Sequence, residues 1–176
     1  MEAETRRQKI LKLLSHHNPV TGKQLGEKFE VSRQVIVQDI ALLRARGYYI
    51  IATPQGYINQ SDNQAEDSYT FTIASKHEEE GIQEELATIV DLGGTILDVI
   101  VEHPIYGELK GQLIIKSRRD IQSFMNRLQG AKANPLSTLT EGIHLHTIKA
   151  PDREAITEIK NALNAKNFLV NDNKNH

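Results

Sequence analysis

Two histidines separated by one residue are the first sign of chemistry in this chain. His144 and His146 lie in the segment Gly-Ile-His-Leu-His-Thr-Ile. In a β-strand, their side chains would stand on the same face, roughly 6.5 to 7 Å apart along the strand. Neutral imidazoles are common ligands of transition metals. A pair of this kind on a strand is more often structural, so it needs further ligands to define a site.

Two residues upstream could complete a set of nitrogen and oxygen ligands. Glu85 follows Ile82 by three positions and precedes Ile89 by four, so it falls on the apolar stripe of a predicted helix. A carboxylate on a buried face usually has a cationic partner. In one unbroken helix, His77 would lie about 12 Å from Glu85, too far to share one ion. We therefore expect His77 to lie in the loop before this helix and to fold back.

Three imidazoles and one carboxylate suit zinc, nickel, iron, cobalt or manganese, and the geometry would select among them. Water or a small molecule could fill an open coordination position. The chain contains no cysteine, which excludes disulfides and thiolate ligands. A metal-dependent hydrolase would use the same ligand types, but the sequence has no His-Glu-x-x-His motif. A regulator that senses the metal itself is a second alternative.

The N-terminal third has the pattern of a winged helix-turn-helix. Apolar residues recur at helical spacing, with hydroxyl residues as helix caps, and two short apolar segments flank Thr-Pro-Gln. Helix, tight turn, helix and wing place one helix in the major groove of DNA. We expect helices over 5–16, after Thr21 and over Arg33–Arg46, and a hairpin over 48–58.

The third of these helices carries residue types that read DNA bases. Ile36, Ile40 and Leu43 have helical spacing and should face the core, which leaves the opposite face outward. Arginine reads guanine, glutamine reads adenine, an aliphatic group contacts the thymine methyl, and helix N-termini hold phosphates. The residues that we expect to contact DNA are Thr21, Lys23, Ser32, Arg33, Gln34, Val37, Gln38 and Arg44, with Arg6, Arg7 and Arg46 as further phosphate contacts.

Charge is distributed unevenly between the two parts of the chain. Residues 1–60 carry nine Lys/Arg and five Asp/Glu, whereas residues 61–176 carry twelve and eighteen. A basic first third favours a nucleic-acid partner, although an excess of four charges is modest. A winged helix that binds protein is the alternative, and it predicts no steep salt dependence on duplex DNA. No apolar run reaches the roughly 20 residues of a membrane span, and the N-terminus lacks a signal-peptide core. We therefore expect a cytoplasmic protein without a membrane partner.

The remainder of the chain predicts a second domain. Residues 61–68 are polar and are the expected linker between a DNA-binding domain at 1–60 and a regulatory domain at 69–172. The order β-α-β-β-α-β-α-β predicts a two-layer α/β domain with a mainly antiparallel sheet, so the whole chain is α+β. The expected strands are 69–74, 95–102, 109–115, 142–149 and 168–170, and the expected helices are 79–91, 117–129 and 152–165.

Four segments together resemble a known family of regulators. Val31–Ile40 and Ile51–Tyr57 look like the DNA-binding module of niacin-responsive transcriptional repressors. His103–Gly107 and Gly142–His146 resemble the three-histidine domain that follows it in that family. The resemblance implies an HPr-like regulatory domain and repression of genes for NAD synthesis or niacin uptake, with nicotinic acid as corepressor and no enzymatic activity. It also implies a transition metal, nickel, zinc, iron or manganese, bound by His77, Glu85, His144 and His146.

These features lead to an expected mode of action. We expect a homodimer joined through its C-terminal domains, with one recognition helix for each half-site of a double-stranded DNA operator. Nicotinic acid would bind near the metal, and His103, Tyr106 and Arg118 are candidate contacts for it. A guanidinium group is well shaped for a carboxylate. An ordinary hairpin turn and a solvated arginine are the alternative interpretations of these three residues.

Overall fold

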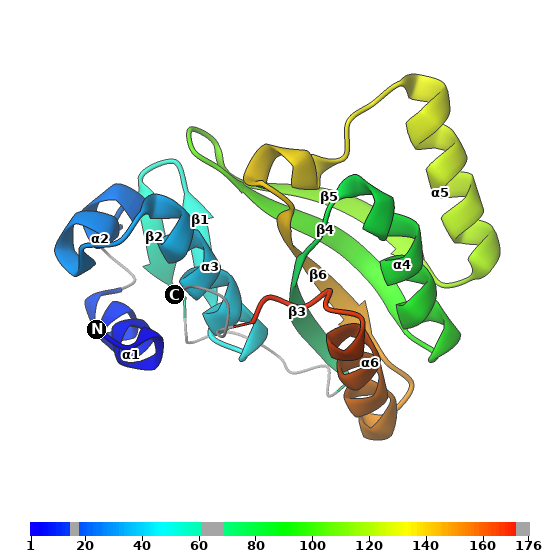
Figure 1. Cartoon of the computed structure of the whole chain (residues 1–176), viewed down its shortest axis with the longest axis horizontal. Coiled ribbons are helices and arrows are strands. Elements are labelled where there is room, and N and C mark those ends of the chain that lie inside the picture. The colour runs from blue at the N-terminus through cyan, green and yellow to red at the C-terminus, as the bar shows by residue number, and fades with distance from the viewer. Residues whose placement is uncertain (15–17, 61–68, 172–176) are drawn as a thin grey trace.

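The computed structural model describes residues 1–14, 18–60 and 69–171, and it shows a helical N-terminal domain beside a larger α/β domain (Figure 1). The expected linker at 61–68 lies outside the described residues. Within the described parts of the chain, no helix combines the length and the hydropathy that a membrane crossing requires.

The N-terminal domain is a winged helix-turn-helix, as the sequence predicts. Thr21 caps the second helix with a capping box, in which the Gln24 backbone N–H donates to Thr21 Oγ1 (3.1 Å) and the Gln24 side chain accepts from the Thr21 N–H (2.9 Å). Ser32 caps the third helix by accepting from the Val35 N–H at 3.2 Å. The elements are α1 (Ala3–Leu13), α2 (Gly22–Phe29), α3 (Arg33–Ala45) and the antiparallel hairpin β1 (Ile50–Thr53) and β2 (Gly56–Asn59).

A buried ion-pair cluster lies inside this domain. Asp39 is 2% exposed, and its carboxylate accepts from Arg6 Nε at 2.6 Å and from an Arg7 guanidinium nitrogen at 3.2 Å. The prediction that Arg6 and Arg7 contact phosphates is therefore wrong, because both side chains are buried and hold Asp39. Asp39 lies three residues after Ile36 and four before Leu43, so the rule that identified Glu85 would also have found it.

The C-terminal domain has two layers, as predicted. Its four-stranded antiparallel sheet has the order β3-β6-β4-β5, and its three long helices all lie on one face of the sheet (Figure 1). The expected last strand at 168–170 forms only an isolated bridge, between Ser75 and Leu169. The elements are β3 (Thr70–Lys76), the 3-10 helix η1 (Glu79–Gly81), α4 (Ile82–Asp91), β4 (Thr95–His103), β5 (Gly107–Ile115), α5 (Arg118–Ala131), the 3-10 helix η2 (Leu136–Thr140), β6 (Ile143–Lys149) and α6 (Arg153–Ala165).

Strand β6 separates two environments, because successive side chains of a strand point to opposite faces of the sheet. His144 and His146 point to the face that the helices cover, and Ile148 joins the hydrophobic core there. Ile143 and Leu145 point to the other face, where helix α3 of the N-terminal domain packs. That second cluster consists of Val37, Ala41, Ala74, Ile100, Ile143, Leu145 and Val170.

Candidate metal centre

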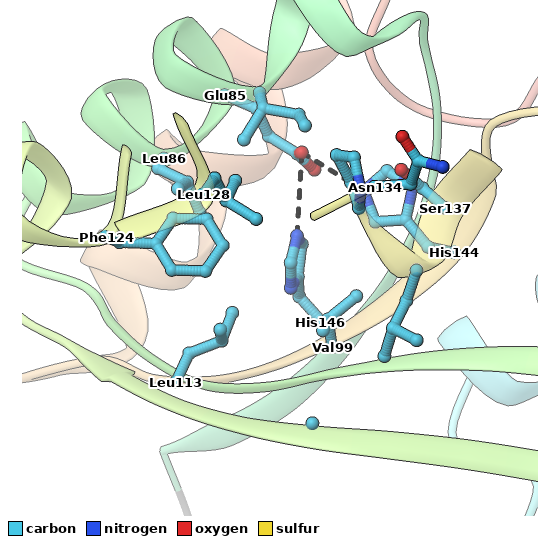
Figure 2. A pocket seen from close by; sticks show the side chains of 14 residues that line it. Glu85, Leu86, Val99, Leu113, Phe124, Leu128, Asn134, Ser137, His144 and His146 are labelled. Carbon is cyan, nitrogen blue, oxygen red and sulfur yellow. Dashed lines mark hydrogen bonds and ion pairs between the residues drawn. The ribbon is translucent and has the colours of Figure 1, made fainter. Parts of the chain in front are cut away.

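The four predicted ligands converge from three elements. His77 lies in the short loop between β3 and η1, as expected, and Glu85 lies in the first turn of α4. Figure 2 shows the Glu85 carboxylate pointing toward the two histidines of β6. Its Oε2 atom lies 3.1 Å from Nε2 of His144 and 3.5 Å from Nε2 of His146, and it also contacts Nε2 of His77. We call these four residues the histidine cluster.

Each of the three rings is held in one orientation by a backbone carbonyl. The Nδ1 atom of His77 donates to Glu78 O (2.7 Å), that of His144 to Gly142 O (2.8 Å), and that of His146 to Asp98 O (2.7 Å). A proton on Nδ1 leaves Nε2 with a free lone pair in the neutral ring. Metal-binding histidines are commonly oriented in this way. All three free nitrogens then face the same carboxylate oxygen.

This arrangement requires a positive charge at its centre. Glu85 is 1% exposed, and its Oε1 atom has no hydrogen-bond partner among the described residues. Burial raises the pKa of Glu85, but His144 and His146 outweigh burial and hold it well below its ordinary value. Burial lowers the pKa of His77 and His146, but Glu85 reverses this and raises both. Protons or a metal ion can supply the charge.

The donor set fits a divalent transition metal. Ligand atoms of His77, Glu85 and His144 all lie within 4.8 Å of one another. His146 adds a fourth donor on the same carboxylate oxygen, although it falls outside that compact trio. Three imidazole nitrogens and one carboxylate oxygen suit zinc, nickel, iron or manganese.

Gly142 fixes the spacing between the His77 loop and β6. Its φ of +87° lies in the left-handed region, and a Cβ atom built there would stand 2.5 Å from the carbonyl oxygen of His77. The Gly142 carbonyl also accepts the hydrogen bond from His144. This glycine therefore positions two of the four members of the histidine cluster.

A cavity of about 220 Å³ adjoins the histidine cluster, which contributes Glu85, His144 and His146 to its wall (Figure 2). None of the described residues that line it is a lysine or an arginine. An apolar cavity of about 150 Å³ can hold benzene, so this one has room for one aromatic ring with a small substituent. We call it the effector cavity, after the role that we propose for it below; its other main walls are Leu86, Val99, Leu113, Phe124, Leu128, Asn134 and Ser137.

The three candidate effector contacts lie outside this cavity. His103 accepts from the backbone N–H groups of Ile105 (3.1 Å) and Tyr106 (3.3 Å), and so orders the turn between β4 and β5. Arg118 is exposed and donates from Nε to Asp91 at 2.8 Å. The residues that do line the cavity, such as Asn134 and Ser137, could not be predicted from the sequence, because residues 132–137 have no periodicity and lie far in sequence from the histidine cluster that they adjoin.

The predicted DNA contacts fall into two groups. Thr21 and Ser32 cap helices, and Lys23 is exposed. The other five lie on or near the face of α3 that meets the C-terminal domain. Val37 is only 5% exposed, so the prediction that it faces outward is wrong: it packs on the apolar face of the sheet. In that second group, Arg33 pairs with Glu102 (3.0 Å), Arg44 pairs with Glu108, Gln38 donates to Asn171 O (3.3 Å), and Gln34 is half-buried.

Comparison with known proteins agrees with these two parts. Residues 6–58 match an HTH domain family and residues 70–172 match the 3H domain family. The chain is 46% identical over 175 residues to the probable transcription repressor NiaR of Thermotoga maritima. The aligned residues cover 97% of this chain and 98% of that protein. It is 42% identical over 177 residues to the transcription repressor NadR of Bacillus subtilis, with 98% and 96% covered.

Proposed function

The chain belongs to the family of transcription repressors in which an HTH domain precedes a 3H domain, and we propose that it represses genes for NAD synthesis or niacin uptake in response to nicotinic acid. Membership in this family makes it a DNA-binding regulator and not a hydrolase. We further propose that it binds a double-stranded operator as a homodimer. The observation that carries the proposal is a histidine cluster in the wall of a cavity that fits a single aromatic ring.

We propose that His77, Glu85, His144 and His146 hold a transition metal ion, nickel, zinc, iron or manganese. Three rings with anchored Nδ1 atoms and an unpartnered buried carboxylate oxygen support this. When bound, the ion would supply positive charge and a coordination position beside the effector cavity. The protein's own residues orient the ligands and exclude bulk water from the centre.

We place nicotinic acid in the effector cavity. Phe124, Leu113 and Leu128 offer apolar surface to an aromatic ring, and Asn134 and Ser137 offer polar groups. The carboxylate of the ligand would meet the Glu85 carboxylate without a lysine or arginine in the described lining to balance it. Only the histidine cluster can balance this charge, through a bound metal ion or through protons on His77 and His146. At a pH where these histidines are neutral, binding of the anion therefore depends on the metal, which makes the metal a requirement for sensing and not the signal itself.

Calorimetry with nicotinic acid tests this directly. The titration is made at a pH above the raised pKa values of His77 and His146, so that protons do not replace the metal. Metal-loaded protein should then bind the ligand, and protein stripped with a chelator should bind it at least about tenfold more weakly, because an uncompensated anion in the cavity costs more than about 1.4 kcal/mol. A parallel DNA-binding titration adds metal and nicotinic acid separately. If metal alone produces the full change in operator affinity, the protein is a metal sensor and the niacin proposal is wrong.

A further inference from the structure

The face of α3 that lies away from the core of its own domain is not open to solvent. Ile36, Ile40 and Leu43 occupy the inner face of the helix, as helical spacing predicts. On the other side, Val37 and Ala41 are 5% exposed and pack against Ala74 and Leu145 of the sheet. Outward residues near the N-terminal end of a recognition helix are the ones that contact base edges. In this structure the C-terminal domain lies over part of that surface.

Acidic residues of the C-terminal domain hold two of the predicted DNA contacts. Glu102 and Glu108 pair with Arg33 and Arg44, respectively, across the domain contact. Carboxylates, phosphates and the guanine edge all accept hydrogen bonds from the same N–H groups of an arginine side chain. An arginine that is paired with a carboxylate therefore cannot use those groups to contact DNA. Tyr57 of the wing also donates its hydroxyl to Glu102. Both arginines are therefore engaged by the protein itself.

The turn between Glu102 and Glu108 is fitted to the wing. Gly107 has a φ of +75°, and a Cβ atom there would lie 2.7 Å from the backbone carbon of Thr53 in β1. The Ala52 backbone N–H donates to Glu108 at 3.2 Å. The His103–Gly107 motif thus brings the β4–β5 hairpin against the N-terminal domain, and this contact explains a segment that the effector site does not use.

We propose that this structure is a closed, DNA-incompetent form, in which the sheet and the β4–β5 hairpin of the C-terminal domain mask the reading face of α3. The major groove is about 12 Å wide and admits a helix but not a helix with a sheet packed on its reading face. Operator binding therefore requires α3 to separate from the sheet. The fraction of molecules that have separated sets the apparent affinity for DNA.

Strand β6 connects this contact to the histidine cluster. Leu145 packs on the α3 side of the strand, and its neighbours His144 and His146 face the effector cavity on the other side. A small interdomain cavity of about 30 Å³ is lined by His144 together with Val37 and Glu102. A ligand that shifts β6 would alter both sites. This coupling step rests on the proposed function, whereas the closed contact itself does not.

Thiol labelling tests the closed contact without DNA or ligand. The chain has no cysteine, so Val37→Cys introduces a single thiol at the masked face. Lys28→Cys, at an exposed site on α2, and Ile36→Cys, in the core of the N-terminal domain, are the matched controls. In the full chain, Val37→Cys should react about tenfold or more slowly than Lys28→Cys and faster than Ile36→Cys. Equal rates for Val37→Cys and Lys28→Cys overturn the proposal.

A charge reversal tests the consequence for DNA binding. Glu102→Lys/Glu108→Lys places lysines against Arg33 and Arg44 and should open the contact. The control Glu154→Lys/Glu158→Lys makes the same change of charge at exposed positions on α6. If the closed form dominates by about ten to one, the reversal should raise affinity for duplex DNA about tenfold more than the control does. An equal gain in both variants shows that bulk charge is responsible, and the masking proposal is then wrong.

Discussion

Substituting Gly142 by alanine is expected to damage the histidine cluster without altering any of its members. The left-handed conformation, with φ of +87°, costs a side-chain-bearing residue about 1–2 kcal/mol. The new Cβ would also stand 2.5 Å from the His77 carbonyl oxygen, which is backbone and can yield only if the His77 loop moves. We expect a loss of at least about 2 kcal/mol of folding stability from strain of this kind. Metal affinity should fall about 10- to 100-fold, as for other changes in the groups that orient ligands.

Two further glycines separate the causes of this effect. Gly47 has a φ of +97° but no described atom within 4 Å of its would-be Cβ, so Gly47→Ala measures the conformational cost alone. Gly130 lies in α5 and is equally open, so Gly130→Ala should stabilise the protein by about 0.5 kcal/mol. Denaturant unfolding gives the three stabilities, and competition with a chromogenic chelator gives the three metal affinities. If Gly142→Ala binds metal as tightly as Gly47→Ala does, Gly142 has no role in positioning the ligands.

Three other predictions follow from the buried charges and the cavity. Asp39→Ala leaves Arg6 and Arg7 buried without the carboxylate that they share, and it should lower the folding stability by about 3–5 kcal/mol. The control Glu4→Ala removes an exposed partner of Arg7 and should leave the thermal unfolding temperature almost unchanged. Burial lowers the pKa of His77 and His146, but Glu85 outweighs burial and raises both pKa values above 6.5. In metal-free protein, protonation of these two histidines therefore stabilises the fold fully below about pH 6.5, and this stabilisation is lost as the pH rises through the raised pKa values. The unfolding temperature of metal-free protein should thus fall as the pH rises above about 6.5, and the increment from added metal should grow, since metal and protons compete for the same nitrogens. Phe124→Ala should weaken nicotinic acid binding and leave metal content unchanged; loss of both would mean that the cavity and the histidine cluster are not separable in this way.

The histidine cluster could be predicted from the sequence because local spacing rules apply to each of its members. Helical spacing put Glu85 on a buried stripe, strand alternation put the two histidines of β6 on one face, and a distance limit put His77 in a loop. Each rule acts over a few residues, and the fold satisfies all of them. The same spacing rule applies to Asp39, but Arg6 and Arg7 stand near a DNA-binding helix, where arginine is equally typical of a phosphate contact, so the sequence alone does not distinguish the two roles.

The packing of α3 against the C-terminal sheet, through Val37 and Ala41, could not be predicted by such local rules. The periodicity of apolar residues identifies those that face the core of their own domain. The remaining residues of the helix are then predicted to be exposed to solvent. Val37 is one aliphatic residue on that remaining face, and an exposed aliphatic residue is unremarkable. Its partners lie on β3, β4 and β6, and Arg33 meets Glu102 across 69 positions of sequence. Contacts at such separation leave no local signal, so the domain contact emerges only from the fold.

A repressor that acts with a corepressor, as proposed above, must bind its operator poorly until the ligand arrives, and the proposed closed form would be that state. The strength of the closed contact is suited to a switch. Part-exposed ion pairs such as Arg33 with Glu102 contribute about 0.2–1 kcal/mol each, and burial of Val37 contributes about 1.5–3 kcal/mol. Allosteric coupling of about 1–3 kcal/mol is typical and is comparable to this sum. If nicotinic acid is the corepressor, as proposed above, it needs to favour the open form by only about 5- to 150-fold, and a displacement of β6, which borders both sites, would supply this.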